Sequence, residues 1–208
     1  MPGSRHMVGA SVRQKDGAKK VCGAAKFAGD LKFPGMLHAR VVRSTVPHAL
    51  LKKVDTGPAL KMPGVVAVLT AQDVPGHNRV GIIVKDEPVL VDDKIRRVGD
   101  ALALVAATGP REAEAAAKAV RVDYEELEPV FDPEQALEPG APKVHGDTNL
   151  LYRRRICRGD AAKAMREADV VVEGTYTTQM VEHAYIEPEA GVAVREGDTV
   201  TIWVSTQN

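Results

Sequence analysis

The sequence has few aromatic residues, few cysteines and no excess of charge of either sign. Aromatic residues make up 4% of its 208 residues, and 28 Lys and Arg balance 28 Asp and Glu. Proteins that bind nucleic acid or anionic membranes usually carry a basic excess. The neutral balance therefore argues against both classes of partner. A hydrophobic fraction of 44% at low net charge is typical of a folded chain rather than a disordered one.

Long apolar runs are also lacking. No window approaches the roughly 18 uninterrupted apolar residues of a membrane-spanning helix, and Ala101–Ala107 is only strand-sized. The first nine residues contain no apolar signal region, and residues 1–7 resemble an expression-vector remnant. Cys22 and Cys157 lie far apart and form no CxxC or zinc spacing, so we expect two reduced thiols in a cytoplasmic protein.

The common catalytic motifs are missing. The chain contains no GxGxxG, GxxxxGK[ST], HExxH or GxSxG, which removes the usual sequence support for phosphate cradling, zinc proteolysis and serine hydrolysis. The six histidines do not cluster, and we predict no metal ligands.

Hydrophobic patterning predicts alternating strands and helices, hence a layered α/β or α+β unit. The strongest helix is Pro110–Ala119, with Pro at its first position and alanine throughout. Ala101–Ala107 is expected to be a buried central strand. The other expected strands in the first 131 residues are Met36–Arg43, Leu50–Asp55, Val65–Leu69, Pro88–Val91, Lys94–Val98 and Val120–Glu125. The first twenty residues are polar and basic and are expected to form an extended arm.

A proline-rich stretch, Glu128–Pro142, is the best candidate for a domain boundary. Beyond it we expect strands at Leu150–Ile156 and Val170–Thr178 and a helix at Asp160–Ala168. A terminal hairpin is expected to pair Gly191–Val194 with Val200–Val204.

Two segments are rich in functional groups. Gln179–Pro188 holds an amide, two carboxylates, an imidazole and a phenol, which could orient a ligand or form a satisfied polar network. The basic run Arg153–Arg155 could contact phosphate, although a solvated strand edge is the more common meaning of so short a run.

Short motifs along the chain resemble, in order, those of the molybdenum-binding large subunit of the xanthine dehydrogenase and aldehyde oxidase family. The resemblance begins at Asp16–Asp30 and continues to the Ser-Thr-Gln sequence at Ser205–Gln207. The intervening matches are Leu37–Ala39, Val42–Ser44, Pro47–Ala49, Met62–Val65, Leu69–Pro75, Glu87–Leu90, Val98–Gly99, Ala101–Val105, Val122–Leu127, Gly159–Asp160, Ala168–Asp169, Glu182–His183 and Glu187–Pro188.

The resemblance implies an α+β architecture: an α/β hammerhead domain followed by a partial α/β molybdopterin-binding domain. We expect an N-terminal arm at 1–19, the hammerhead at 20–131, a connector at 132–143 and the start of the molybdopterin-binding domain at 144–208. Family members hydroxylate an aldehyde or an N-heteroaromatic carbon with water as the oxygen source. The cofactor carries that chemistry, and the protein binds and orients.

The resemblance also suggests site residues. Glu182 and His183 match positions that line or support the cofactor site, and either could instead be a structural pair beneath it. Val181 occupies the place of a Gln that xanthine dehydrogenases and some aldehyde oxidoreductases carry two residues before the His, which argues against a purine hydroxylase. Gln207 ends the last expected strand, and its role is open. The glutamate that acts as general base in the family has no counterpart in these 208 residues, so no catalytic residue is assigned.

From the resemblance we expect a fragment or split subunit that is inactive alone and binds no molybdopterin by itself. Its partners would be the remaining molybdenum-binding region and subunits carrying iron–sulfur clusters and FAD. A non-catalytic docking subunit is the alternative. The apolar last strand, with Ile202, Trp203 and Val204, suggests self-association.

Overall fold

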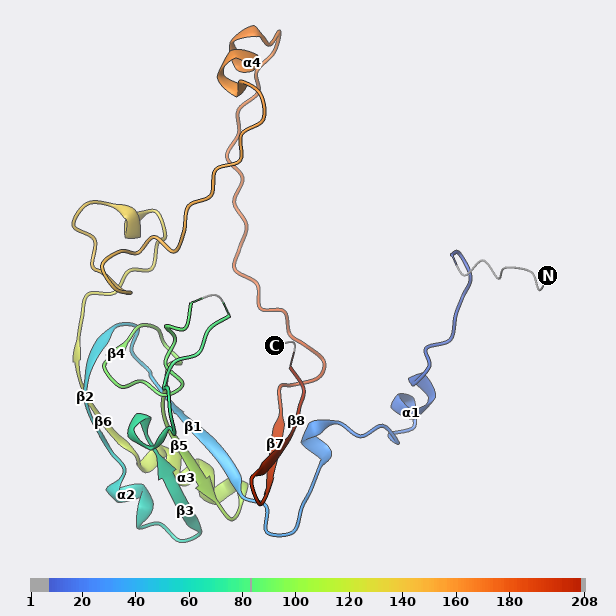
Figure 1. Cartoon of the computed structure of the whole chain (residues 1–208), viewed down its shortest axis with the longest axis vertical. Helices are drawn as coiled ribbons and strands as arrows, with labels where there is room; N and C mark the ends of the chain where they lie inside the picture. The colour runs from blue at the N-terminus through green and yellow to red at the C-terminus, as the bar shows by residue number, and fades with distance from the viewer. Residues whose placement is uncertain (1–7, 83, 207–208) are drawn as a thin grey trace. The chain divides into compact units, whose positions relative to one another are not determined.

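The computed structural model describes residues 8–82 and 84–206, and the chain divides into two compact units (Figure 1). One unit is formed by residues 35–171 and the other combines residues 1–34 with residues 172–208. The mixture of helices and antiparallel sheets confirms the α+β class. None of the described helices is long and apolar enough to cross a membrane.

The unit of residues 35–171 contains two three-stranded antiparallel sheets. The first has the order β1–β5–β3 and the second the order β4–β2–β6. The strands are β1 (His38–Arg43), β2 (Ala49–Asp55), β3 (Val65–Leu69), β4 (Lys94–Ile95), β5 (Ala101–Ala107) and β6 (Arg121–Glu126).

Strand β5 lies between β1 and β3 in the first sheet, and its side chains are buried on both faces of the sheet. Ala103 and Val105 belong to one apolar cluster, and Leu102, which points the other way, belongs to a second. Val42 and Val122 pack against both clusters, so the clusters form one continuous core.

Helix α3 (Pro110–Ala119) packs on β1 and β5, and the shorter α2 (Gly57–Leu60) packs against α3 and β3 (Figure 1). Pro110 at the first turn of α3 favours the start of this helix. Two alanines of the helix, Ala113 and Ala116, are completely buried. Their spacing of three residues places both on the face that meets the sheet. Small side chains on that face let the helix approach the strands closely.

Two glycines make the turns beside these strands. Gly64 has a φ of 79°, and a Cβ there would lie 2.9 Å from the hydroxyl oxygen of Thr108, so the turn before β3 accepts only glycine without rearrangement. Gly99 has a φ of 95° in the turn before β5. Its N–H donates to the Ser44 carbonyl at 2.9 Å, which ties this turn to the end of β1.

The proline-rich connector is an ordered loop rather than a loose chain. It contains a short 3-10 helix, η3 (Gln135–Leu137). The side chain of Asn149 closes the loop by accepting from the Val144 N–H at 2.9 Å and donating to the carbonyls of Ala136 and Pro142 at 2.8 and 2.9 Å. The predicted helix forms as α4 (Ala161–Glu167), and the Asp160 carboxylate caps it by accepting from the Lys163 N–H at 2.9 Å.

Three predicted strands are wrong. Pro88–Val91 is not a strand because the side-chain amide of Asn78 bonds the N–H and the carbonyl of Leu90, the groups that a neighbouring strand would use. Leu150–Ile156 and Val170–Thr178 are extended but unpaired with any strand of the described residues. β-propensity produces a strand only where a neighbour pairs with its backbone.

The second unit contains the predicted hairpin, formed by β7 (Gly191–Glu196) and β8 (Thr199–Val204). The 3-10 helix η1 (Ala28–Asp30) packs on β7, and the rings of Phe33 and Trp203 lie 5.1 Å apart. The N-terminal residues are therefore not only an extended arm, since they also form the helix α1 (Gly17–Val21) and this contact with the hairpin. Residues 1–7 lie outside the described part of the chain.

We expect the core around β4 and β5 to limit the stability of the unit of residues 35–171. Ile95 is fully buried, so Ile95→Ala should lower the free energy of unfolding by about 2–5 kcal/mol. The exposed Ile82 provides the control, because Ile82→Ala removes the same atoms and should change stability by less than about 0.5 kcal/mol. Denaturant unfolding of both variants measures the difference, and equal effects would contradict this description of the core.

Candidate functional site

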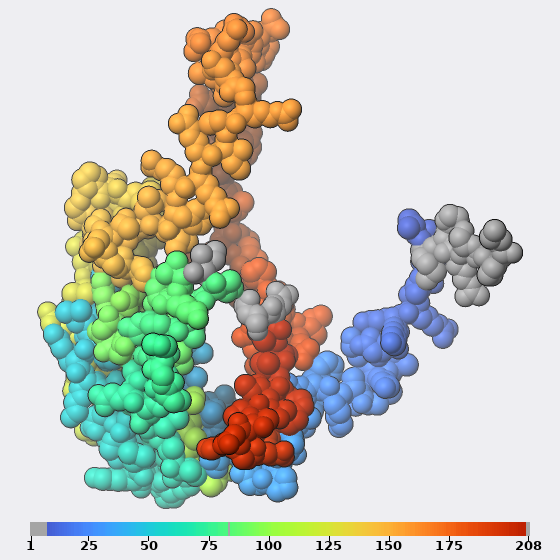
Figure 2. Space-filling view, viewed as in Figure 1, coloured from blue at the N-terminus to red at the C-terminus, as the bar shows by residue number. Residues whose placement is uncertain are grey.

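The segment Gln179–Pro188 is exposed along its whole length, as are all residues from 151 to 189 (Figure 2). Within it, the Glu182 carboxylate accepts a hydrogen bond from the Ala184 N–H at 2.5 Å. The rings of His183 and Tyr185 are stacked, with centroids 5.5 Å apart and planes 5° from parallel. The structure thus brings together three of the functional groups that the sequence singled out.

A hollow of about 630 Å³ lies beside this segment, within the unit that holds both chain ends. Its wall combines residues from opposite ends of the sequence: Lys26, Phe27, Ala28, Tyr185, Ile186, Glu187, Glu189, Val204, Ser205 and Thr206. The Ser205 N–H donates to the Ala190 carbonyl at 3.0 Å, and the Ala190 N–H donates to the Ser205 hydroxyl at 3.3 Å. Sequence reasoning missed the N-terminal wall, since nothing local to residues 26–28 signals a contact so distant in sequence.

These residues do not by themselves form a site for a metal or a molybdenum cofactor. Glu182 and His183 are both exposed, and the Glu182 carboxylate already accepts a hydrogen bond from the backbone N–H of Ala184. Within residues 8–82 and 84–206, no group of three His, Cys, Asp or Glu side chains could hold a metal ion. Gln207 lies outside the described residues.

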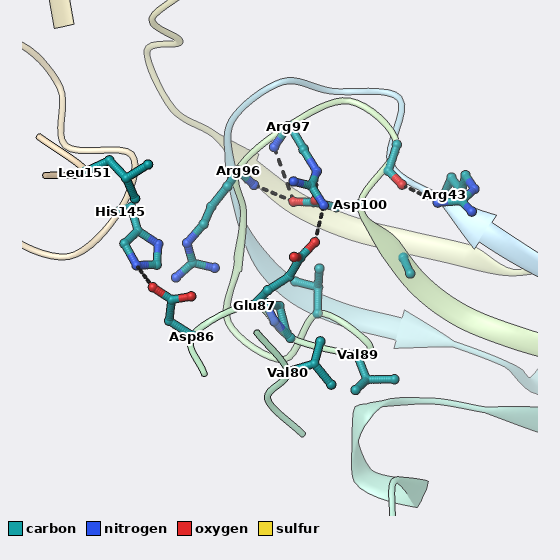
Figure 3. A pocket seen from close by; sticks show the side chains of 14 residues that line it. Arg43, Val80, Asp86, Glu87, Val89, Arg96, Arg97, Asp100, His145 and Leu151 are labelled. Carbon is teal, nitrogen blue, oxygen red and sulfur yellow. Dashed lines mark hydrogen bonds and ion pairs between the residues drawn. The ribbon is translucent and has the colours of Figure 1, made fainter. Parts of the chain in front are cut away.

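A second hollow, of about 620 Å³, lies in the unit of residues 35–171 and is lined by charged side chains (Figure 3). Arg97 forms ion pairs with Glu87 and, at 3.1 Å, with Asp100. His145, which follows the connector, lies 3.0 Å from the Asp86 carboxylate. These side chains of opposite charge pair with one another, so their charges hold neighbouring loops together instead of being left unpaired for a ligand.

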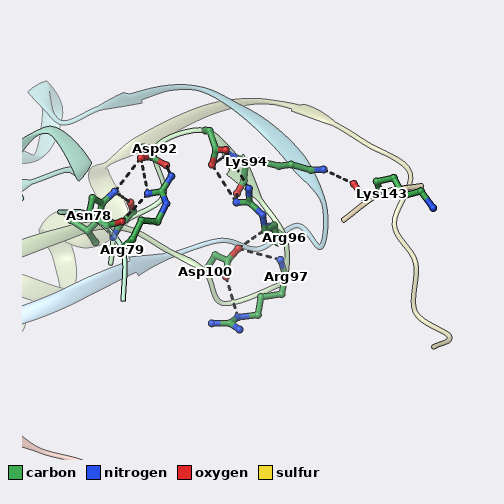
Figure 4. Close-up of polar contacts among 10 residues, drawn as sticks. Asn78, Arg79, Asp92, Lys94, Arg96, Arg97, Asp100 and Lys143 are labelled. Carbon is green, nitrogen blue, oxygen red and sulfur yellow. Dashed lines mark hydrogen bonds and ion pairs between the residues drawn. The ribbon is translucent and has the colours of Figure 1, made fainter. Parts of the chain in front are cut away.

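Asp100 organises the turn at this hollow (Figure 4). One oxygen of its carboxylate, which is only 12% exposed, accepts from the N–H groups of Arg96 and Arg97 at 2.8 and 3.2 Å. The Asp100 carbonyl accepts from the Ser44 N–H at 2.8 Å, and Arg43 donates to the Gly99 carbonyl at 2.8 Å. The turn is thereby fixed to the end of β1.

Further polar contacts secure the neighbouring loops (Figure 4). Arg79 donates two hydrogen bonds to Asp92, at 2.8 and 2.9 Å, and these bonds lower the pKa of Asp92 even though partial burial acts in the opposite direction. The Lys94 ammonium donates to the Lys143 carbonyl at 2.6 Å, and burial lowers the pKa of Lys94. The connector is thus attached to the second sheet.

The basic run contributes Arg153 and Arg154 to the wall of an open hollow of about 710 Å³, which Asp86 and His145 also line. The residues of the run are exposed, the Arg154 guanidinium lies 5.4 Å from the ring centroid of Tyr152, and Arg155 Nε donates to the Cys157 sulfur at 3.2 Å. Cys22 and Cys157 are both free and exposed.

Comparison with known proteins gives the family of the chain. Residues 22–128 match the model described as aldehyde oxidase and xanthine dehydrogenase, a/b hammerhead domain. Residues 144–208 match the molybdopterin cofactor-binding domain. The chain belongs to the aldehyde oxidase and xanthine dehydrogenase family.

Two curated relatives and one solved structure illustrate the similarity. The nicotinate dehydrogenase large molybdopterin subunit of Eubacterium barkeri is 50% identical over 194 residues, which cover 93% of this chain and 46% of the relative. A probable xanthine dehydrogenase subunit of Bacillus subtilis (strain 168) is 47% identical, with 93% and 26% covered. The aldehyde oxidoreductase of Desulfovibrio gigas superposes with a TM-score of 0.84 at 34% identity, over 90% of this chain and 22% of that one. The chain therefore spans less than half the length of these relatives.

The pKa shift of Asp92 predicts how pH changes the stability of the unit of residues 35–171. Because the folded pKa lies below the unfolded one, the stabilisation is present above pH about 4 and is lost as the pH falls through the folded value. Asp92→Asn should therefore cost about 0.5–1 kcal/mol at pH 7 and less at pH 3.

Urea unfolding at both pH values measures this, with Asp169→Asn as an exposed control that should change little at either pH. An unchanged cost of Asp92→Asn at pH 3 would show that the ion pair with Arg79 is not its source.

Proposed function

We propose that these residues form the hammerhead domain and the beginning of the cofactor-binding domain in the large subunit of a molybdenum hydroxylase. The proposed bounds are 20–131 for the hammerhead, 132–143 for the connector and 144–208 for the cofactor-binding part, after an arm at 1–19. The observation that carries the proposal is the 50% identity, over 93% of this chain, to a large molybdopterin subunit.

The proposed reaction is hydroxylation of an N-heteroaromatic carbon, with water as the oxygen source. The two curated relatives described above are named for N-heteroaromatic compounds, nicotinate and xanthine. The aldehyde oxidoreductase structure is less similar, at 34% identity, which makes an aldehyde the second candidate. Val181, in place of the Gln of xanthine dehydrogenases, favours a substrate other than a purine.

In the assembled enzyme, the molybdenum cofactor would supply the oxidation chemistry. Glu182 and His183 would line or support its site, and the general base would come from residues outside these 208. Subunits carrying iron–sulfur clusters and FAD would accept the electrons. This chain alone is proposed to be inactive and to retain no cofactor.

The assembled enzyme should contain molybdenum and should transfer oxygen from labelled water to nicotinate faster than to xanthine or a simple aldehyde. The experiment is metal analysis and mass spectrometry on the natively purified complex, with the 208-residue chain mixed with molybdopterin as the comparison. Turnover by the isolated chain would contradict the proposal. A complex with partner subunits but no molybdenum would instead favour a docking subunit.

The isolated chain should self-associate through the apolar strand β8. The side chains of Ile202 and Val204 in this strand are 63% and 53% exposed. An exposed apolar strand can pair, through its free backbone groups, with the same strand of another copy. Light scattering over a range of concentrations should show oligomers that Ile202→Lys weakens. Thr201→Lys adds the same charge without removing an apolar side chain and should weaken them less. A strictly monomeric wild-type particle would contradict the prediction.

A further inference from the structure

The backbone between His183 and Tyr185 turns at Ala184, whose φ is 49°. This left-handed conformation is unfavourable for a residue with a Cβ, so it requires support from neighbouring groups. The support visible here is the 2.5 Å hydrogen bond from the Ala184 N–H to the Glu182 carboxylate. Glu182 therefore acts on the backbone of the turn.

The turn places two aromatic rings face to face. A centroid separation of 5.5 Å with planes 5° from parallel corresponds to an offset stack, which is a favourable arrangement for aromatic rings. Tyr185 is 62% exposed, so burial in a core does not explain its position. Its ring contact in this structure is with His183.

We propose that Tyr185 is a positioning residue that holds the imidazole of His183, with Glu182 maintaining the turn that brings the two rings together. The inference rests on the proposed function, in which His183 lines or supports the cofactor site. It goes further by assigning Tyr185 a role and by giving Glu182 a backbone role instead of a direct contact with the cofactor.

The physical advantage is preorganisation. An exposed histidine samples several rotamers, and ordering it when the rest of the site assembles costs conformational entropy. A stacked neighbour removes part of that freedom beforehand, which keeps the imidazole near one orientation.

The stack can be tested in the 208-residue chain without any cofactor. The imidazole protons of His183, assigned by comparison with His183→Gln, should show an upfield ring-current shift in NMR spectra. Tyr185→Phe should keep this shift and Tyr185→Leu should lose it. Tyr176→Leu is the matched control, because Tyr176 lies in the same exposed stretch of residues 151–189 and is itself 92% exposed, and it should leave the shift unchanged. A wild-type shift in Tyr185→Leu would overturn the proposal.

The same variants in the assembled enzyme separate this inference from the proposed function. Tyr185→Leu should lower kcat by about threefold to tenfold with KM little changed, and Tyr185→Phe should restore it. If His183→Ala reduces turnover or molybdenum content but Tyr185→Leu does neither, Tyr185 does not position His183, although the site assignment holds. If His183→Ala changes neither turnover nor molybdenum content, the proposed role of His183 fails, whatever the NMR spectra show.

Discussion

The burial of strand β5 on both faces is the constraint on which the unit of residues 35–171 depends. Ala103 and Val105 face one apolar cluster and Leu102 faces the other, so this strand joins the two clusters. The fully buried alanines of α3 let the helix lie close to β5, where a larger side chain would force the layers apart. Together with Val42 and Val122, which pack against both clusters, this strand couples the packing of the two sheets.

The charged hollow in the unit of residues 35–171 and the segment around His183 differ in how their polar groups are used. In the hollow next to β5, the carboxylates of Glu87 and Asp100 are paired with Arg97, and the pairs join loops that apolar packing does not reach. Around His183 the side chains are exposed, and the ring contact is with a residue two positions away. The first arrangement is complete as a structural network. The second consists of exposed side chains held by contacts that are local in the sequence.

Local signals predicted the elements whose stability is local. Proline at the start of Pro110–Ala119, the apolar run Ala101–Ala107 and the hairpin around Gly197 each carry their own determinants, and all three form. The strand expected at Val170–Thr178 does not, since pairing depends on a neighbour that its sequence cannot specify. The contact between Phe33 and Trp203 was unpredictable for the same reason. The stack of His183 on Tyr185 was not predictable either, because it depends on the left-handed turn at Ala184, which an alanine rarely adopts and which its sequence does not signal.

The loop closed by Asn149 has a consequence for how this chain can vary. Its side chain holds backbone groups of Ala136, Pro142 and Val144, and Lys94 holds the carbonyl of Lys143. An inserted residue between 136 and 149 would pull at least one of these groups out of reach. The stretch Pro129–Phe131 lies between two restrained residues: the Glu128 carbonyl lies 2.6 Å from the Nδ1 atom of His48, and the Asp132 carboxylate accepts from the N–H groups of Glu134 and Gln135. Differences in length between homologues should therefore accumulate between Glu128 and Asp132 and be rare between Ala136 and Asn149.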